Sequence, residues 1–463
     1  MKKVSQLIEE VESKFEVERV LVNGVPLWPF YKVFLFDKIY VPGGTLVKHS
    51  LGQKLKLVKH AFYGWKNYWN YSAPFLAFSL TEQRKELNGA FPDKMIDGIV
   101  EAIKEQGKTF HLELPVTDPK PKRLIPNQTT ASKLPLRIVE AYYSKFGNVP
   151  QIENESILQE INAYCDVELS SDYVLRRFWG QYKAMQWFLR KRKNVKALFI
   201  VVSYMNFGSL LAAKEKGIKV IETQHGTISK EHFGYYYSKP IDDRYFPDYL
   251  LSFGENEKGF FSQTSHMLKG EKVIPVGHFY LEATYQQMKG IKRQKEEKVR
   301  VAVSLQDDKI GEKIIPFLIE AARKDNSIEY VFIPRKKTTE YYATHYDLPE
   351  NIIFQPEWNI YQAIMYSDVH TSVYSTCAIE APSLGTPNVL VNIDNRAKSY
   401  FSAFLDEYNY TLYADTPEEY LKKIKEVGKL KATKEKEIRT SNNRNIEANY
   451  FENIKAAMKI ILN

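Results

Sequence analysis

The chain of 463 residues contains little cysteine and lacks long hydrophobic runs. Its two cysteines, Cys165 and Cys377, are too few for a disulfide framework and do not have the spacing of a zinc site. No run of about 18 uncharged apolar residues occurs, which argues against a membrane-spanning helix. Acidic residues stand where a signal peptide has its apolar region, in Met-Lys-Lys-Val-Ser-Gln-Leu-Ile-Glu-Glu. We therefore expect a cytoplasmic protein.

The sequence also contains no internal repeat, no low-complexity tract and no Asp-x-Asp motif. A composition with 44% hydrophobic and 26% charged residues is typical of a globular protein, and this length allows two or three domains. The net charge of +9 favours an anionic partner, such as a nucleic acid, an anionic membrane surface or a nucleotide-sugar. Because the basic residues are dispersed and form no recognition motif, we expect no nucleic acid among the partners.

Buried-strand patterns alternate with helical patterns along most of the chain. Strands are predicted at 73–80, 109–114, 197–203, 219–223, 249–253 and 272–276, with helices at 93–104, 134–146, 155–164, 171–192, 208–216 and 256–266. The charged stretch 289–298 has the composition of an interdomain linker. Beyond it, strands are predicted at 299–305, 330–334, 352–355, 369–372 and 388–393, and helices at 311–324, 359–366, 376–384, 416–427 and 441–461. Such alternation predicts doubly wound parallel sheets. The stretch 117–133 is rich in Pro, Lys and Asn, which indicates a surface loop.

The strand predicted at 219–223 leads directly into Gln-His-Gly at 224–226. Open α/β sheets place ligands at the carboxyl ends of their strands, and a glycine lets the backbone approach a ligand closely. His225 in this position can act as a base or donate to a phosphate, or it can be a structural histidine with satisfied hydrogen bonds. The polar residues Thr81–Arg84, which include Glu82, follow the first strand in the same way.

The stretch 367–393 is predicted to form a strand, a turn, a helix, a second turn and a further strand. Ser372, Ser375 and Thr376 are hydroxyl residues near the helix start, where free N–H groups and the helix dipole favour an anion such as phosphate. Glu380 follows one turn later on the same face of the helix. An ordinary capped helix with a solvated Glu380 is the alternative interpretation.

The pattern Ser-x-x-Ser-Thr-x-x-x-Glu-Ala-x-x-x-Gly-x-Pro resembles the donor-site segment of GT-B glycosyltransferases and of the related sugar-nucleotide 2-epimerases. The Gln-His-Gly segment, with His232 and Tyr235 after it, resembles bacterial capsular and surface polysaccharide biosynthesis transferases. The turn that begins at Gly277-His278 resembles the Val-x-Gly-Asn/His turn that marks the passage into the second domain of GT-B enzymes. The resemblance covers about residues 195–395 and is weak before residue 70.

The resemblance implies a GT-B fold, with two Rossmann-like domains facing a central cleft and the C-terminal helix packed back on the first domain. The implied domains are 1–280 for the acceptor, 281–440 for the nucleotide-sugar donor, and 441–463 for the returning helix. Metal-dependent transferases of the other major fold hold their ion with Asp-x-Asp, so its absence favours a metal-independent site without cofactors.

The implied functional residues fall into three sets. For catalysis, His225 is the candidate base and Glu82 is the next candidate. The donor set comprises Gly277, His278, Arg335, Lys336, Ser372, Ser375, Thr376 and Glu380, although the loop Pro-Arg-Lys-Lys at 334–337 departs from the Lys-x-His-Pro often found in these transferases. The acceptor set comprises Arg84, Gln224, Gly226, His232 and Tyr235.

The favoured function is transfer of a sugar from a nucleotide-sugar to a cell-surface polysaccharide or glycolipid. A CDP-glycerol-type polyol-phosphate transferase, a sugar-nucleotide 2-epimerase and a non-enzymatic binding protein of polysaccharide assembly are the alternatives. The sugar, the nucleobase, the acceptor, the anomeric outcome and the oligomeric state stay open. Residues 48–71 mix lysines with Trp and Tyr, which is the composition of a peripheral contact with the anionic inner face of the cell membrane. A basic surface loop that covers the core is the alternative interpretation.

Overall fold

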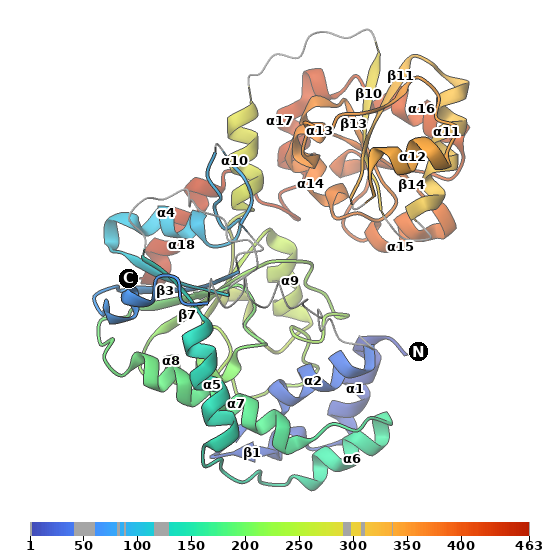
Figure 1. Cartoon of the computed structure of the whole chain (residues 1–463). Helices are drawn as coiled ribbons and strands as arrows, with labels where there is room; N and C mark the ends of the chain where they lie inside the picture. Colours follow the sequence, from blue (N-terminus) through green and yellow to red (C-terminus); the bar gives the residue numbers. More distant parts are fainter. Residues whose placement is uncertain are drawn as a thin grey trace. The chain divides into compact units, whose positions relative to one another are not determined.

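The computed structural model describes residues 2–40, 61–80, 84–87, 89–114, 129–289, 298–306, 311–335 and 337–462. The chain divides into two compact units (Figure 1). Unit 1 comprises Met1–Ser252, Asn256–Pro275 and Phe451–Asn463, and unit 2 comprises Phe253–Glu255 and Val276–Tyr450. The sequence places these boundaries at residues 280 and 440, so the division of the structure lies slightly earlier at the first and later at the second.

Unit 1 is built on a parallel sheet of seven strands with the order β5-β4-β3-β6-β7-β8-β9. The strands are β3 (Phe75–Leu80), β4 (Thr109–Leu114), β5 (Thr129–Ser132), β6 (Ala197–Ile200), β7 (Lys219–Thr223), β8 (Tyr249–Ser252) and β9 (Val273–Pro275). Counted along the chain this order is 3-2-1-4-5-6-7, which extends the doubly wound order of dinucleotide-binding folds by one strand. The order reverses between β3 and β6, which pair directly.

Helices cover both faces of this sheet. Figure 1 shows α5 (Leu134–Phe146), α7 (Ser171–Leu189) and α8 (Phe207–Lys214) on one side, with α4 (Asp97–Ile103) and α18 (Tyr450–Leu462) on the other. The other helices of this part are α1 (Val4–Lys14), α2 (Trp28–Tyr40), α6 (Ser156–Cys165) and α9 (Glu255–Gln263). The Lys219 ammonium donates to the Ile461 carbonyl at 2.5 Å, which ties α18 to β7. The expected return of the C-terminal helix to the first domain is thus confirmed.

The aromatic segment near the N-terminus belongs to the core of unit 1. Trp28, Phe30, Tyr31 and Phe36 on α2 are completely buried, and they join one hydrophobic cluster with the residues of the sheet. Among the described residues, no helix has both the length and the apolar character needed to cross a bilayer. Most of the predicted membrane contact at 48–71 lies outside the described residues, which begin again at residue 61.

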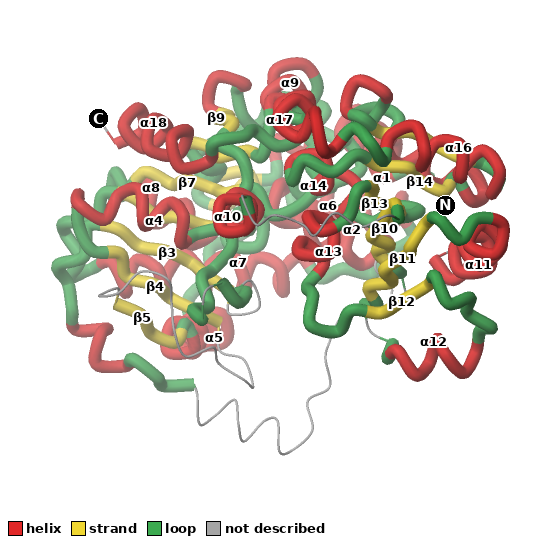
Figure 2. The backbone as a smooth tube through the Cα atoms, turned by 90° about the horizontal axis from the view of Figure 1, so that it is seen from above, coloured by secondary structure: helices red, strands yellow, loops and turns green. Residues whose placement is uncertain are grey.

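Unit 2 contains a parallel sheet of six strands with the order β12-β11-β10-β13-β14-β15, or 3-2-1-4-5-6 along the chain. The strands are β10 (Val299–Ser304), β11 (Ile328–Ile333), β12 (Ile352–Phe354), β13 (Val369–Thr371), β14 (Asn388–Val391) and β15 (Thr411–Ala414). Figure 2 shows the strands of each sheet side by side as yellow rows. This is the complete Rossmann order, and its reversal lies between β10 and β13.

Alternation along β10 shows that both faces of the second sheet are buried. Val301 and Val303 pack with α11 (Ile314–Lys324) and α16 (Pro417–Val427). Ala302 packs on the opposite face with α13 (Ile360–Tyr366) and α14 (Cys377–Ser383). Successive side chains of a strand point to opposite faces of the sheet, so an apolar strand such as β10 is covered by helices on both faces. Two Rossmann-like units with a returning C-terminal helix confirm the expected GT-B fold class.

Some elements differ from the sequence prediction. The stretch 117–133 is not only a loop, because its end forms β5, while residues 115–128 lie outside the described part. The helix expected over 441–461 is wrong in its first half, since α17 (Lys431–Ser441) ends there and α18 begins at Tyr450. Helices α12 (Thr339–His345) and α15 (Arg396–Phe401) and strand β15 were not predicted. Helix α10 (Phe279–Met288) precedes residues 290–297 of the predicted linker, which lie outside the described residues.

Candidate functional site

In unit 1, the chemistry-bearing side chains gather after the carboxyl ends of β6 and β7. Residues 224–226 follow β7 directly, as the sequence predicts. The loop after them turns back and returns Tyr235 to the strand end, where its hydroxyl lies 3.5 Å from Nδ1 of His225. Tyr204, which follows β6, has its ring 6.4 Å from that of His225. We call His225, Tyr235, Glu222, His232 and Tyr204 the histidine cluster.

His225 is partly buried, so its ring reaches the surface without being fully solvated. Burial lowers its pKa, and a hydrogen bond to the Val201 backbone opposes that shift. The neutral imidazole is therefore favoured at physiological pH, and it is this form that can accept a proton.

Glu222 is a buried carboxyl group in the middle of the sheet. Its Oε1 accepts hydrogen bonds from the Ser203 backbone N–H at 3.0 Å and from the Tyr235 hydroxyl at 2.8 Å. Burial raises the pKa of Glu222 to about 7, and those two hydrogen bonds limit the rise. The Tyr235 hydroxyl thus connects His225 to the Glu222 carboxyl group, whose pKa is near neutrality.

His232 lies against the aromatic rings of the cluster. Its ring centroid is 4.7 Å from that of Tyr235 and 5.3 Å from that of Tyr204. Its Nδ1 accepts from the Gly234 N–H at 3.2 Å, and burial lowers its pKa to about 4. A neutral His232 with one nitrogen already engaged helps to hold the Tyr235 ring in place.

The remaining acceptor candidates have different surroundings. Gln224 is buried and donates to Glu257 Oε1 at 2.8 Å, so it braces the strand end. Gly226 is exposed, and a Cβ there would meet no atom within 4 Å, which leaves space beside His225. Arg84 is buried, lies 3.6 Å from Glu113 and donates to the Phe91 carbonyl. Glu82, the second catalytic candidate, lies outside the described residues.

In unit 2, the serine-rich turn lies at the reversal of strand order between β10 and β13. Ser372 is buried and its hydroxyl donates to the Ser304 carbonyl at the end of β10. The Tyr374 N–H donates to Gln306 Oε1 at 3.3 Å. These hydrogen bonds fix the turn across the position where open α/β sheets bind ligands. Ser372 secures this turn rather than presenting its hydroxyl to solvent.

The next residues begin helix α14. Ser375 Oγ accepts from the Cys377 N–H at 3.3 Å, so one of the expected free N–H groups is already capped. Thr376 is exposed. Glu380, one turn into the helix, is partly buried and accepts a hydrogen bond from the Tyr361 hydroxyl at 3.1 Å. Gly385 has φ +78° just after the helix, the left-handed conformation that its predicted capping role requires.

Cationic side chains follow β11 on the same edge of the sheet. Ser304 at the end of β10 is paired with Ile333 at the end of β11. Arg335, two residues after Ile333, therefore lies near this turn, and it is exposed. Lys337 forms an ion pair with Glu312 and lies 4.0 Å from the centre of the Tyr341 ring, so its charge is already compensated. Lys336 lies outside the described residues.

Gly277 and His278 occupy the passage into unit 2. Gly277 has φ +91°, and a Cβ there would lie 2.2 Å from the Glu447 carbonyl oxygen. His278 is buried, and its Nδ1 accepts from the Leu281 N–H at 3.2 Å as the N-terminal cap of α10. Both residues therefore have clear structural roles in this turn, beside the donor role that the resemblance implies.

Several residues of these sites were missed from the sequence. Glu222 and Tyr204 belong to the histidine cluster, and Tyr361 holds Glu380. His370 is completely buried between Asn388 Oδ1 at 2.8 Å and Ser304 Oγ at 2.9 Å, and burial lowers its pKa to about 4. A glutamate inside an apolar strand just before Gln-His-Gly was the available signal for Glu222. Within the described residues, no group of three or more His, Cys, Asp or Glu side chains could hold a metal ion.

No protein-family model and no curated protein matches this sequence. Solved structures do resemble it. UDP-GlcNAc 2-epimerase from Neisseria meningitidis bound to UDP-GlcNAc has 11% identity and a TM-score of 0.48, with 84% of this chain and 98% of that chain covered. The calicheamicin glycosyltransferase CalG4 has 13% identity and a TM-score of 0.46, with 84% and 99% covered. MurG from Acinetobacter baumannii has 12% identity and a TM-score of 0.46, with 83% and 99% covered. Similarity at this level carries no argument about activity, so the fold class rests on the two sheets themselves.

Proposed function

We propose that the protein is a metal-independent glycosyltransferase that transfers a sugar from a nucleotide-sugar to a cell-surface polysaccharide or glycolipid. The observation that carries this proposal is the histidine cluster at the carboxyl edge of the unit 1 sheet. It supplies a neutral imidazole beside an open surface at Gly226. A base in such a position can remove the proton of an acceptor hydroxyl while the nucleotide leaves.

The hydrogen bonds of the cluster support this role of His225. When Glu222 is ionised, the single proton of the Tyr235 hydroxyl is donated to the carboxylate. The phenol oxygen can then accept only from an N–H, which favours the proton on Nδ1 of His225. In that tautomer, Nε2 is the nitrogen that can accept a proton. If the enzyme retains configuration, His225 orients a substrate instead.

The donor belongs to unit 2 in this proposal. Arg335 supplies positive charge for the diphosphate, with Ser375 and Thr376 at the start of α14, and Glu380 binds the ribose hydroxyls. Without a metal, the leaving phosphate must be stabilised by cations and oriented backbone dipoles. The expected partners are a nucleotide-sugar and a saccharide or glycolipid acceptor at the inner face of the cell membrane, with no cofactor and no nucleic acid.

A thermal-shift screen with UDP, CMP, CDP, GDP and their sugars tests the proposal. A ligand that binds only the folded state stabilises the protein, and the stabilisation grows with the logarithm of the ratio of ligand concentration to dissociation constant. We expect stabilisation by one nucleotide family, and release of that nucleotide from its sugar only when an acceptor is added. The turnover should survive EDTA. Loss on chelation with recovery in Mg²⁺ or Mn²⁺ would show that the phosphate site is metal-dependent.

The same experiment separates the alternatives. A 2-epimerase converts the nucleotide-sugar without an acceptor, a polyol-phosphate transferase consumes CDP-glycerol, and a binding protein releases no nucleotide. Any of these outcomes would replace glycosyl transfer as the function.

A further inference from the structure

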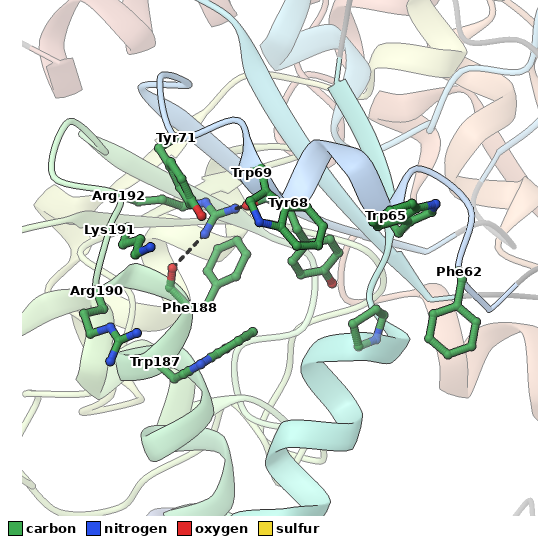
Figure 3. Close-up of a pocket in the computed structure, with 11 residues that line it drawn as sticks. Phe62, Trp65, Tyr68, Trp69, Tyr71, Trp187, Phe188, Arg190, Lys191 and Arg192 are labelled. Atoms are coloured by element: carbon green, nitrogen blue, oxygen red, sulfur yellow. Dashed lines mark hydrogen bonds between the residues drawn. The ribbon is translucent and has the colours of Figure 1, made fainter.

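Unit 1 contains an apolar cavity of about 580 Å³ that shares no residue with the histidine cluster. This volume lies within the range of small-molecule sites. Figure 3 shows it between the short helix η2 (Trp65–Trp69), the end of α7 and the residues that follow α7. Its lining is aromatic with a basic border, and comprises Phe62, Trp65, Tyr68, Trp69, Tyr71, Pro135, Trp187, Phe188, Arg190, Lys191 and Arg192. We call it the aromatic pocket.

The pocket lies away from the ligand-binding edge of the sheet. Tyr71 comes shortly before β3 and Arg192 shortly before β6, so both stand near the amino ends of those strands. His225 follows the carboxyl end of β7. The aromatic pocket is therefore not a part of the proposed acceptor site.

Large apolar side chains at the pocket are unusually exposed. Trp69 is 61% exposed, Trp65 and Phe62 are 50% exposed, and Trp187 is 41% exposed. In Figure 3 the Trp187 ring extends beneath the space bordered by Tyr68 and Trp69, with Trp65 and Phe62 on the side away from Lys191. Exposed aromatic groups around an apolar cavity are costly in water, which points to an apolar occupant.

The apolar surface continues along helix α5, which begins beside the pocket at Pro135. Ile138, Tyr142 and Phe146 follow Pro135 at steps of three and four residues and are all exposed. This spacing places them on the same face of the helix as Pro135. The pocket is thus one end of a larger surface, of the kind that inserts into the interfacial region of a bilayer.

Positive charge borders the pocket, and no carboxylate of the described residues forms an ion pair with it. Arg190 and Lys191 are exposed. Arg192 is buried, donates to the carbonyls of Phe188 and Tyr68, and has its guanidinium 3.8 Å from the centre of the Phe188 ring. Its Nε has no hydrogen-bond partner among the described residues, and no carboxylate of those residues forms an ion pair with its guanidinium group. A buried cation bonded only to carbonyls and rings favours an anion nearby.

We propose that the aromatic pocket binds an anionic phospholipid of the membrane, with an acyl chain against the Trp and Phe rings and the phosphate near Arg190, Lys191 and Arg192. The exposed aromatic groups and the α5 stripe then lie in the headgroup region, where amphipathic rings are favoured. This site would hold unit 1 at a membrane surface. It does not depend on the chemistry at His225.

Co-sedimentation of the full chain with vesicles tests the membrane contact. We expect binding to vesicles that contain phosphatidylglycerol and not to phosphatidylcholine alone. The double variant Arg190→Glu/Lys191→Glu should bind at least about 25-fold more weakly, since each cation near an anionic surface contributes about fivefold. Trp65→Ala/Trp69→Ala should weaken binding by about tenfold or more, because two exposed rings can no longer be buried in lipid. All four side chains are exposed in the protein, so folding should be preserved.

Matched controls distinguish the pocket from general charge and hydrophobicity. Lys216→Glu makes a charge reversal at an exposed residue outside the pocket, and Tyr408→Ala removes a ring that is 70% exposed. Neither should alter binding by more than about twofold. Pocket variants that bind like the wild type, or equal binding to neutral vesicles, would overturn the proposal.

A soluble lipid tests the cavity itself. Dihexanoylphosphatidylglycerol below its micellar concentration should raise the melting temperature of the protein, and inorganic phosphate at the same concentration should not. Trp187→Ala should abolish that shift. Equal stabilisation by inorganic phosphate, or an unchanged shift in Trp187→Ala, would contradict a site for the acyl chain. Transfer to a soluble acceptor should be normal in the pocket variants, so failure of the proposed function would be seen separately.

Discussion

The buried carboxyl group of Glu222 gives the clearest test of the electrostatics of unit 1. Its pKa in the folded protein is about 7, well above the ordinary value of about 4.5. Between these two pH values, the folded state holds a proton that the unfolded state has released. Stability from this group is therefore fully present below pH ~4.5 and is lost as the pH rises through about 7.

The substitution Glu222→Gln removes this titration and keeps the hydrogen bonds. The amide oxygen can still accept from the Ser203 N–H and the Tyr235 hydroxyl, as Oε1 does. A pKa difference of about 2.5 units corresponds to about 3 kcal/mol. The variant should therefore resemble the wild type in stability near pH 4.5 and exceed it by about 3 kcal/mol above pH 8.

Urea unfolding at pH 4.5, 6, 7 and 8 measures the difference in free energy of unfolding between variant and wild type. Effects of other titrating groups cancel in that difference. Glu271→Gln, at an exposed glutamate of the same unit, should show no such pH trend. A constant difference between Glu222→Gln and wild type from pH 4.5 to 8 would refute the raised pKa and the buried charge beside Tyr235.

Two further predictions concern unit 2. Glu380→Ala should weaken nucleotide binding by about 1–3 kcal/mol in calorimetry, which is the range for a lost charged hydrogen bond. Tyr361→Phe keeps the carboxylate and should weaken nucleotide binding much less. Unchanged nucleotide affinity in Glu380→Ala would remove this residue from the donor site. Gly277→Ala should lower the free energy of unfolding by at least about 2 kcal/mol, because its φ is +91° and its Cβ would meet the Glu447 carbonyl. Gly226→Ala, with open space at Cβ, serves as the control, and equal stability of the two variants would contradict this reasoning.

The alternation of apolar strands and helices was sufficient to predict both sheets except for their edge strands β5 and β15. It worked for β6 (Ala-Leu-Phe-Ile) and β14 (Asn-Val-Leu-Val) because a strand buried on both faces is a short, mostly apolar run between turn residues. It failed for β5, whose sequence Thr-Thr-Ala-Ser has little hydrophobicity and whose place depends on pairing with β4. It also failed at Asn442–Asn449, where the chain turns through a positive φ at Asn449 between α17 and α18.

The sites were less predictable than the fold. Gln-His-Gly at the end of a strand identified His225, but the return of Tyr235 to that strand end depends on a loop with no periodic signal. Ser372 was predicted to contact phosphate because hydroxyl residues favour helix starts. In the structure its hydroxyl instead donates a hydrogen bond to the Ser304 carbonyl at the end of β10. The aromatic pocket was not predictable as a cavity, since its rings come from η2 and α7, which are far apart in sequence.

The central claim is that His225 is the base. Once the screen has identified the donor, kcat and donor affinity should be measured for two separate variants, His225→Ala and Tyr235→Phe. We expect kcat to fall by about 10²–10⁴-fold in His225→Ala, with donor affinity nearly unchanged because the donor belongs to unit 2. Tyr235→Phe should reduce kcat less, since it removes only the group that orients the imidazole. His232→Ala should have a smaller effect than His225→Ala. A His225→Ala variant with near-normal kcat would contradict the account, and Glu82 would then be the residue to test.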